Sequence, residues 1–260
     1  MYHRQKVILD LLRSGRIEIS STARLLGVSE MTLRRDLRRM EEEKLLLQVR
    51  GGAVRYPAEI TPDTAMRQLS EVKFRLVERL LWRIMPLETL FIGTGTTCLA
   101  FAQTIARSKI PPATIITHSL PVASALFQTR HRVILLGGEL RSTSMDLLGP
   151  VAEKNLEEYQ VDWLVSGCDG AFADYGFYTS DVNLSSLERK SISISRQVAV
   201  VTESGKFGRR SLTRFASLEE ISLVVTDDGL PAETAAKMRA RGIEVIEVPV
   251  GQPSLPPPRL

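Results

Sequence analysis

Arginines near the amino terminus follow a spacing that suits contact with DNA. Leu33, Leu37 and Met40 recur at helical intervals, so they predict a helix with one apolar face. The opposite face carries arginines that can enter a major groove and contact base edges and phosphates. A serine before this helix is expected to cap its first turn, after a sharp bend at Gly27. The residues expected to contact DNA here are Ser29, Met31, Thr32, Arg34, Arg35 and Arg38.

The distribution of charge favours the same chemistry. Residues 1–56 contain 12 basic and 7 acidic residues, a net charge of +5, and the remaining residues contain 22 basic and 23 acidic ones, a net of −1. The excess of positive charge therefore lies in the N-terminal part, as expected of a module that approaches phosphates. A solvated amphipathic helix is the alternative, and the bend, the cap and the arginine face together argue against it.

A second group of residues has the composition of a phosphate-binding loop. It lies between an apolar run at 90–92 and a helix expected to start near Cys98. Its glycines let the backbone approach an anion, and its N–H groups and hydroxyls supply donors at the start of the helix. A tight turn is the alternative, and Cys98 stands where a dinucleotide fingerprint needs its third glycine. The loop residues are Gly93, Thr94, Gly95, Thr96 and Thr97.

Other polar residues follow further predicted strands in the same way. Asp169 is suited to accept hydrogen bonds from sugar hydroxyls, and Lys206 can meet a phosphate or sugar oxygen as a point charge. For each residue alone, a loop cap or a surface charge is the alternative. Their shared position after strands predicts one pocket. The residues added to the expected effector site are His118, Ser119, Gly138, Asp169, Gly170 and Lys206.

The elements that position the first group predict a winged helix-turn-helix domain over residues 1–57. Gly51 lets the wing turn sharply, and Arg50 and Arg55 are expected to reach phosphates or the minor groove, with a solubilising surface charge as the alternative. Ser20 or Ser21 is expected to cap the second helix. The expected elements are helices over 3–14, from 20 or 21 to 26 and over 30–44, and strands at 45–49 and 53–56.

The second group requires an α/β domain with a mostly parallel sheet, expected over residues 64–250 after a linker at 56–62. Several of its strands are apolar throughout, as strands buried on both faces should be. The proline-rich segment 251–260 is expected to be disordered. The expected strands are 90–92, 114–117, 133–136, 163–166, 198–202, 223–226 and 244–248.

Composition limits the remaining classes of protein. The two cysteines and three histidines are scattered and suggest neither a disulfide framework nor a metal site, and no run is apolar enough to predict a membrane span or signal peptide. We therefore expect a cytoplasmic protein without a cofactor. A dimer or higher homo-oligomer is expected, because one small module makes few contacts with an operator.

Two motifs resemble the DeoR family of bacterial transcriptional repressors. They are the run over 28–37 and the later Arg50-Gly51-Gly52-Ala53. The glycine- and threonine-rich loops resemble the family's sensor domain, which is similar to ribose 5-phosphate isomerase. The resemblance implies a repressor of a carbohydrate catabolic operon that binds double-stranded operator DNA. It also implies a phosphorylated sugar effector that releases the operator.

The chain departs from the family pattern at several sensor positions. The family often has aspartate, asparagine and aspartate where Gly93, His118 and Glu203 stand, and glutamate then lysine where Leu184 and Glu188 stand. That glutamate is catalytic in the isomerase fold, so Leu184 disfavours an enzyme. The alternatives are a sugar-phosphate isomerase with a DNA-binding appendage, and a winged-helix sensor of nucleotides or redox state.

Overall fold

This computed structural model describes residues 3–12, 17–42, 45–49, 52–55 and 70–249. The chain divides into two compact units, Met1–Glu59 and Ile60–Leu260, which are described one at a time. The predicted linker at 56–62, the predicted tail at 251–260 and the wing residues Arg50 and Gly51 lie outside the described residues.

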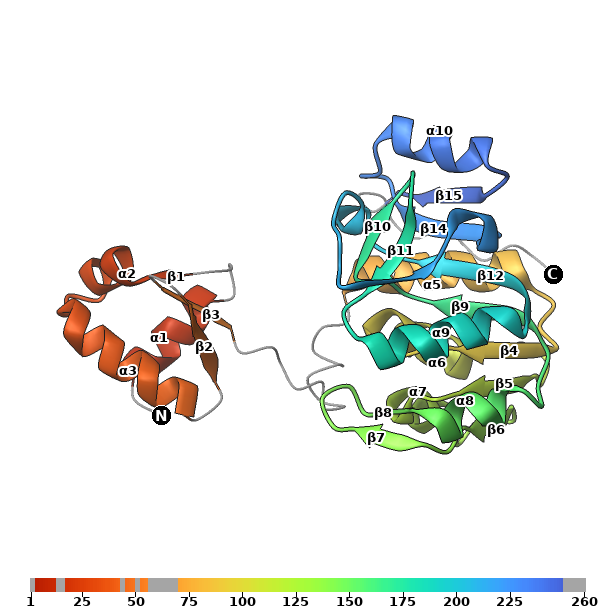
Figure 1. Cartoon of the computed structure of the whole chain (residues 1–260), viewed down its shortest axis with the longest axis horizontal. Helices are drawn as coiled ribbons and strands as arrows, with labels where there is room; N and C mark the ends of the chain where they lie inside the picture. The colour runs from red at the N-terminus through yellow and green to blue at the C-terminus, as the bar shows by residue number, and fades with distance from the viewer. Residues whose placement is uncertain (1–2, 13–16, 43–44, 50–51, 56–69, 250–260) are drawn as a thin grey trace. The chain divides into compact units, whose positions relative to one another are not determined.

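The first unit packs helices on a small antiparallel sheet of order β1-β3-β2 (Figure 1). Its core joins side chains from all these helices, including Ile8, Ala23 and Leu37. Gly52 is required where β1 meets β3, because a Cβ there would lie 2.0 Å from the carbonyl oxygen of Ile17. The elements are α1 (His3–Leu11), β1 (Ile17–Glu18), α2 (Ile19–Leu25), α3 (Glu30–Glu42), β2 (Leu46–Val49) and β3 (Gly52–Arg55).

The predicted cap of the second helix is wrong. Helix α2 begins at Ile19, and its N-cap residue is Glu18, which makes no side-chain capping bond. Ser20 and Ser21 lie inside the first turn, and the Ser21 hydroxyl donates back to the carbonyl of Glu18 at 3.3 Å. The physical reason is the strand β1, which runs directly into the helix and leaves no loop in which a serine could cap it.

The second unit is built on a seven-stranded sheet in which every neighbouring pair is parallel. Its order is β15-β14-β12-β9-β4-β5-β6, and each strand matches one predicted from the sequence. This arrangement confirms the predicted α/β class. The strands are β4 (Thr89–Ile92), β5 (Thr114–Thr117), β6 (Arg132–Leu135), β9 (Val161–Ser166), β12 (Ser195–Val201), β14 (Leu223–Asp227) and β15 (Glu244–Val248).

Helices cover both faces of this sheet, so the strand side chains alternate between two cores. Leu90 and Ile92 of β4 pack with α5 (Glu71–Ile84), α6 (Thr96–Arg107) and α7 (Leu120–Leu126). Phe91 between them packs in the other core. The helices contributing to that core are α8 (Pro150–Leu156), α9 (Val182–Ser193) and α10 (Ala232–Ala240).

Short elements absent from the sequence prediction lie between the main strands, most of them after the carboxyl ends of β6, β9 and β12. They form a β7-β8 hairpin, a β10-β11-β13 sheet and two 3-10 turns. These elements carry loops between the main strands, and each is only three or four residues long. They are β7 (Glu139–Arg141), β8 (Asp146–Leu148), β10 (Gly170–Phe172), β11 (Gly176–Thr179), β13 (Thr213–Ala216), η2 (Ser204–Lys206) and η3 (Leu218–Glu220).

Candidate functional site

Helix α3 separates its side chains into a buried and an exposed face. Leu33, Leu37 and Met40 are fully buried, which confirms the predicted apolar face. Its start is capped as predicted, because the Thr32 amide donates to the Ser29 hydroxyl oxygen at 3.1 Å. The cap fixes the start of α3, and the core fixes its buried face. The exposed face of α3 is therefore held in a defined position.

The outer face of α3 carries the residues predicted to contact DNA. Met31 is 75% exposed, and Arg35 and Arg38 are exposed. Arg34 is also exposed and lies 3.7 Å from the carboxylate of Glu30, one turn earlier. Exposed arginines on a rigid helix can make bidentate contacts with guanine edges and phosphates.

The second unit brings its predicted loops together at one point of the sheet. The chain proceeds from β4 through β5 to β6 on one side, and then continues from β9 on the other side of β4. Open α/β sheets bind ligands where the strand order reverses in this way. The loop 93–97 follows β4 and the loop 167–170 follows β9, so both lie at this reversal point. A Cβ on Gly167 would lie 3.8 Å from Cβ of Thr97, so the loops are in contact.

The loop 93–97 presents the start of α6. Gly95 occupies the N-cap position with φ of 95°, and no side chain caps the helix. The first N–H groups of a helix have no partner within it, so they are donors for an anion. Within the described part of the chain, the buried hydroxyl oxygen of Thr94 also lacks a hydrogen-bond partner.

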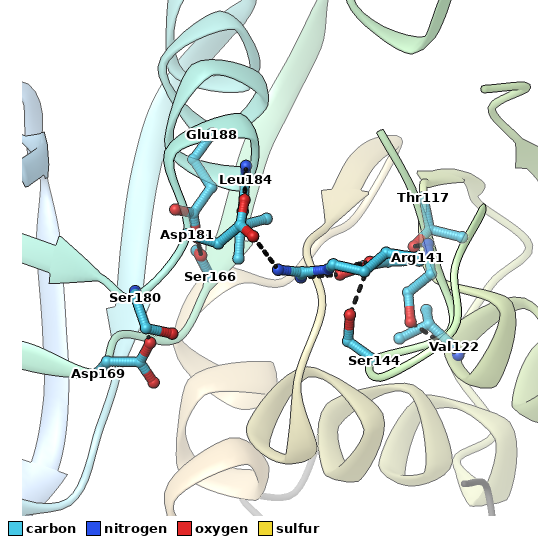
Figure 2. Close-up of polar contacts among 12 residues, drawn as sticks. Thr117, Val122, Arg141, Ser144, Ser166, Asp169, Ser180, Asp181, Leu184 and Glu188 are labelled. Atoms are coloured by element: carbon cyan, nitrogen blue, oxygen red, sulfur yellow. Dashed lines mark hydrogen bonds and ion pairs between the residues drawn. The ribbon is translucent and has the colours of Figure 1, made fainter. Parts of the chain in front are cut away.

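An ion-paired group bridges the β7-β8 hairpin and the start of α9. Arg141 donates to both carboxylate oxygens of Asp146, at 2.9 and 2.6 Å, and lies 3.1 Å from Asp181 (Figure 2). Ser144 donates to Asp146 as well, at 2.8 Å. Asp181 in turn caps α9 by accepting from the amide of Leu184. Burial is the largest single influence on the pKa of Asp146 and raises it, but the hydrogen bonds and charge of Arg141, the charge of His118 and the hydrogen bond from Ser144 together hold this pKa below its ordinary value.

Glu188 of α9 lies at the same edge. The Ser166 hydroxyl, at the end of β9, donates to its Oε1 at 3.4 Å (Figure 2). Its Oε2 is buried and has no hydrogen-bond partner among the residues that the structure describes. Burial, followed by the negative charge of Asp169, raises the pKa of Glu188 well above its ordinary value.

Comparison with known proteins identifies the chain. Residues 4–57 match the DeoR-like helix-turn-helix domain, and residues 69–228 match the DeoR C-terminal sensor domain. The chain belongs to the DeoR family of transcriptional regulators.

Individual relatives agree with this membership. The chain is 30% identical to the transcriptional regulator GlpR of Haloferax volcanii over 94% of this chain and 96% of that protein. It is 28% identical to the transcriptional repressor CsqR of Escherichia coli K12 over 93% of each. Ribose 5-phosphate isomerase A of Neisseria gonorrhoeae aligns over 54% of each chain, with a TM-score of 0.42 and 17% identity, a similarity of fold alone.

Several predicted effector residues of this DeoR-family chain have structural contacts of their own. His118 is buried and stacks on Phe91 with ring centroids 6.0 Å apart, and burial lowers its pKa to about 4, so it is neutral at pH 7. Ser119 caps α7. A Cβ on Gly138 or Gly170 would lie 2.6 and 2.1 Å from a backbone oxygen, so close packing alone requires glycine there.

The other predicted residues flank the reversal point. Asp169 is exposed and accepts a hydrogen bond from the Ser180 amide at 2.9 Å. Lys206 ends the η2 turn, close enough to Cys168 for its charge to act on that thiol. Glu203, which precedes the turn, lies 3.6 Å from Lys73 of α5.

Sequence reasoning missed Arg141, Asp146 and Asp181. No motif marks them: Arg141 pairs with Asp146 across one hairpin, and its contact with Asp181 joins that hairpin to a helix distant in sequence. The one available signal was a pair of glycines, Gly137 and Gly138, immediately before an arginine-bearing segment. Among the described residues, no group of histidine, cysteine and acidic side chains could hold a metal ion, and no helix could cross a membrane.

Proposed function

We propose that the protein represses a carbohydrate catabolic operon and is released from its operator by a phosphorylated sugar. The observation that carries the proposal is the uncapped start of α6 at the reversal point of the sheet. A helix start with free donors, glycine on its N-cap and a buried unpartnered hydroxyl on Thr94 suits a phosphate. We propose repression and not activation of transcription because one relative is named as a transcriptional repressor.

Release requires that the effector bind the DNA-free form more tightly than the DNA-bound form, because a ligand shifts an equilibrium only by differential affinity. Two copies of α3 on a repeated half-site give the affinity that one copy lacks, so the active form is a homodimer or higher homo-oligomer acting in the cytoplasm. Light scattering of the complex with DNA measures this assembly.

The test begins with DNA selected from a random library by the protein itself. Gel retardation is then measured with a panel of phosphorylated sugars and their unphosphorylated forms. We expect one phosphorylated sugar to release the DNA and raise the melting temperature, by an amount corresponding to about 2.7 kcal/mol at 100 times its dissociation constant. Equal release by the unphosphorylated form would contradict a phosphate site.

A variant locates the site. Thr94→Val removes the unpartnered hydroxyl and keeps the side-chain shape, so the effector concentration for half-release should rise about fivefold, equivalent to a hydrogen bond of about 1 kcal/mol. Thr104→Val is the matched control, because that hydroxyl donates to the Ala100 carbonyl within α6. If both variants respond alike, the loop 93–97 is not the phosphate site.

Two other functions are tested with the same protein. We propose that it has no isomerase activity, because Leu184 stands where the isomerase fold places its catalytic glutamate, and turnover of ribose 5-phosphate would contradict this. Saturable NADH binding observed by fluorescence would instead favour a nucleotide or redox sensor.

A further inference from the structure

One polar side chain at the reversal point is not satisfied by the protein itself. Glu188 is half-buried, but its Oε2 atom is buried and has no hydrogen-bond partner among the described residues. Burying a carboxyl oxygen without a donor costs free energy, so such an atom is expected to have a partner in the functional state. Its other oxygen lies 3.4 Å from the Ser166 hydroxyl, which also has the Gly167 carbonyl within reach at 3.2 Å.

Ser166 connects the carboxyl group to the loop 93–97. Ser166, which binds it, lies at the end of β9, and a Cβ on Gly93 would be 3.4 Å from the Ser166 hydroxyl oxygen. Burial raises the pKa of the Cys98 thiol, in the first turn of α6, and the thiol is close enough to Glu188 for the negative charge of that carboxylate to raise this pKa further. The unsatisfied oxygen and the anion-binding helix start therefore belong to one site.

The positively charged side chain that acts most strongly on Glu188 is not reserved for it, because that side chain is already paired with other carboxylates. Asp169 and Asp146 act on it as negative charges, and Arg141 is the positive charge that acts on it most strongly. The guanidinium of Arg141 already contacts the carboxylates of both Asp146 and Asp181. This side of the site is consequently negative, and it suits a cationic group on the ligand.

We infer that the effector is a phosphorylated amino sugar, whose ammonium group pairs with Glu188 while its phosphate lies on the loop 93–97. The inference rests on the proposed function, because it assumes a phosphorylated sugar at the reversal point of the sheet. An ammonium group supplies both a hydrogen-bond donor and a compensating charge to Oε2. A sugar hydroxyl at the same position supplies the donor alone.

The two ligand classes differ in their proton balance. Without ligand, burial and the neighbouring Asp169 favour the protonated carboxyl of Glu188. When an ammonium group binds, the carboxyl ionises and its proton passes to the buffer, while the ammonium keeps its own protons. A neutral hydroxyl leaves the proton on Glu188. The other titratable groups near the carboxyl are Asp146, Asp169, Arg141 and the thiols of Cys98 and Cys168.

Calorimetry of the full-length protein tests the inference. Glucosamine, galactosamine and mannosamine 6-phosphates are titrated at pH 7 beside the matching hexose 6-phosphates and a set of pentose and ketose phosphates, in two buffers of different ionisation enthalpy. We expect one amino sugar phosphate to bind at least tenfold more tightly than its hydroxyl counterpart and to release up to one proton.

The outcomes separate this inference from the proposed function. If phosphorylated sugars bind but no amino sugar phosphate binds better than its hydroxyl counterpart, the inference is overturned and the proposed function stands. If no member of the panel binds, both are overturned.

Glu188→Gln then assigns the effect to this residue. Glutamine has nearly the same shape and no charge, so the variant should lose the tenfold preference and the proton release while still binding the hydroxyl counterpart. Glu158→Gln, at an exposed position, is the matched control and should behave as the wild type. Unchanged amino sugar binding by Glu188→Gln would overturn the assignment.

Discussion

The two functional regions of this protein are built in opposite ways. Helix α3 buries its apolar side chains and exposes its arginines, so its fold and its function use different residues. At the sheet edge, Arg141 is paired with both Asp146 and Asp181, so the ion pairs that join the β7-β8 hairpin to α9 lie beside the proposed effector site. Substitutions on the exposed face of α3 are therefore expected to change function without loss of stability. At the sheet edge, function and stability depend on the same residues.

We expect the largest effect on stability from a substitution that breaks the ion pairs at the sheet edge. Arg141→Ala leaves the buried carboxylate of Asp146 uncompensated, and we expect the sensor unit to lose about 3 kcal/mol of its free energy of unfolding at pH 7. Chemical denaturation followed by tryptophan fluorescence measures this loss, since Trp82 and Trp163 both belong to the sensor unit. A loss below 0.5 kcal/mol, roughly that of a surface pair, would contradict the coupling.

The pH dependence of the same variant sharpens this result. In the wild type the folded pKa of Asp146 is lowered, so its contribution to stability is present above the unfolded pKa of about 3.9 and is lost as the pH falls through the folded value. In Arg141→Ala, burial raises that pKa instead, so the free energy of unfolding of the variant should increase relative to that of the wild type as the pH falls from 7 towards 5. Parallel pH profiles in the two proteins would contradict this prediction.

An intermediate effect is expected on the exposed face of α3. Arg35→Ala should weaken binding of the selected DNA by about 1–3 kcal/mol for each copy of the helix, because a bidentate base contact is lost. The melting temperature should not change, because the side chain is exposed. Arg196→Ala, at an exposed position of the sensor unit, removes the same charge and should bind DNA as the wild type does. If Arg35→Ala and Arg196→Ala bind the selected DNA with equal affinity, Arg35 does not contact the DNA.

We expect the smallest effect on stability from the loss of a helix cap, and each unit contains one that can be compared with the other. Ser29 caps α3 and Ser70 caps α5, each by accepting from an amide three residues later, at 3.1 and 3.2 Å. Replacing either serine by alanine should lower the free energy of unfolding of its own unit by about 1 kcal/mol. Separate denaturation transitions measure the two losses, and a loss that appears in the other unit would show that the units do not unfold independently.

The same contrast explains how much the sequence could predict. The faces of α3 follow from helical periodicity, which is a local property, and the strands of the parallel sheet follow from apolar runs bounded by turns. The cap at Ser20 or Ser21 was wrong because a two-residue strand is too short to produce a pattern. The ion pair of Arg141 with Asp181 and the contact of Glu188 with Ser166 arise only when distant segments meet at the sheet edge, so no spacing along the chain could indicate them.

The parallel sheet also bears on how such a sensor diverges. Every strand of it ends at the same edge, and the residues that would select a ligand lie beyond those ends, outside the two cores. A lineage can therefore exchange individual loop residues and acquire a different ligand while the scaffold and helix α3 are inherited unchanged.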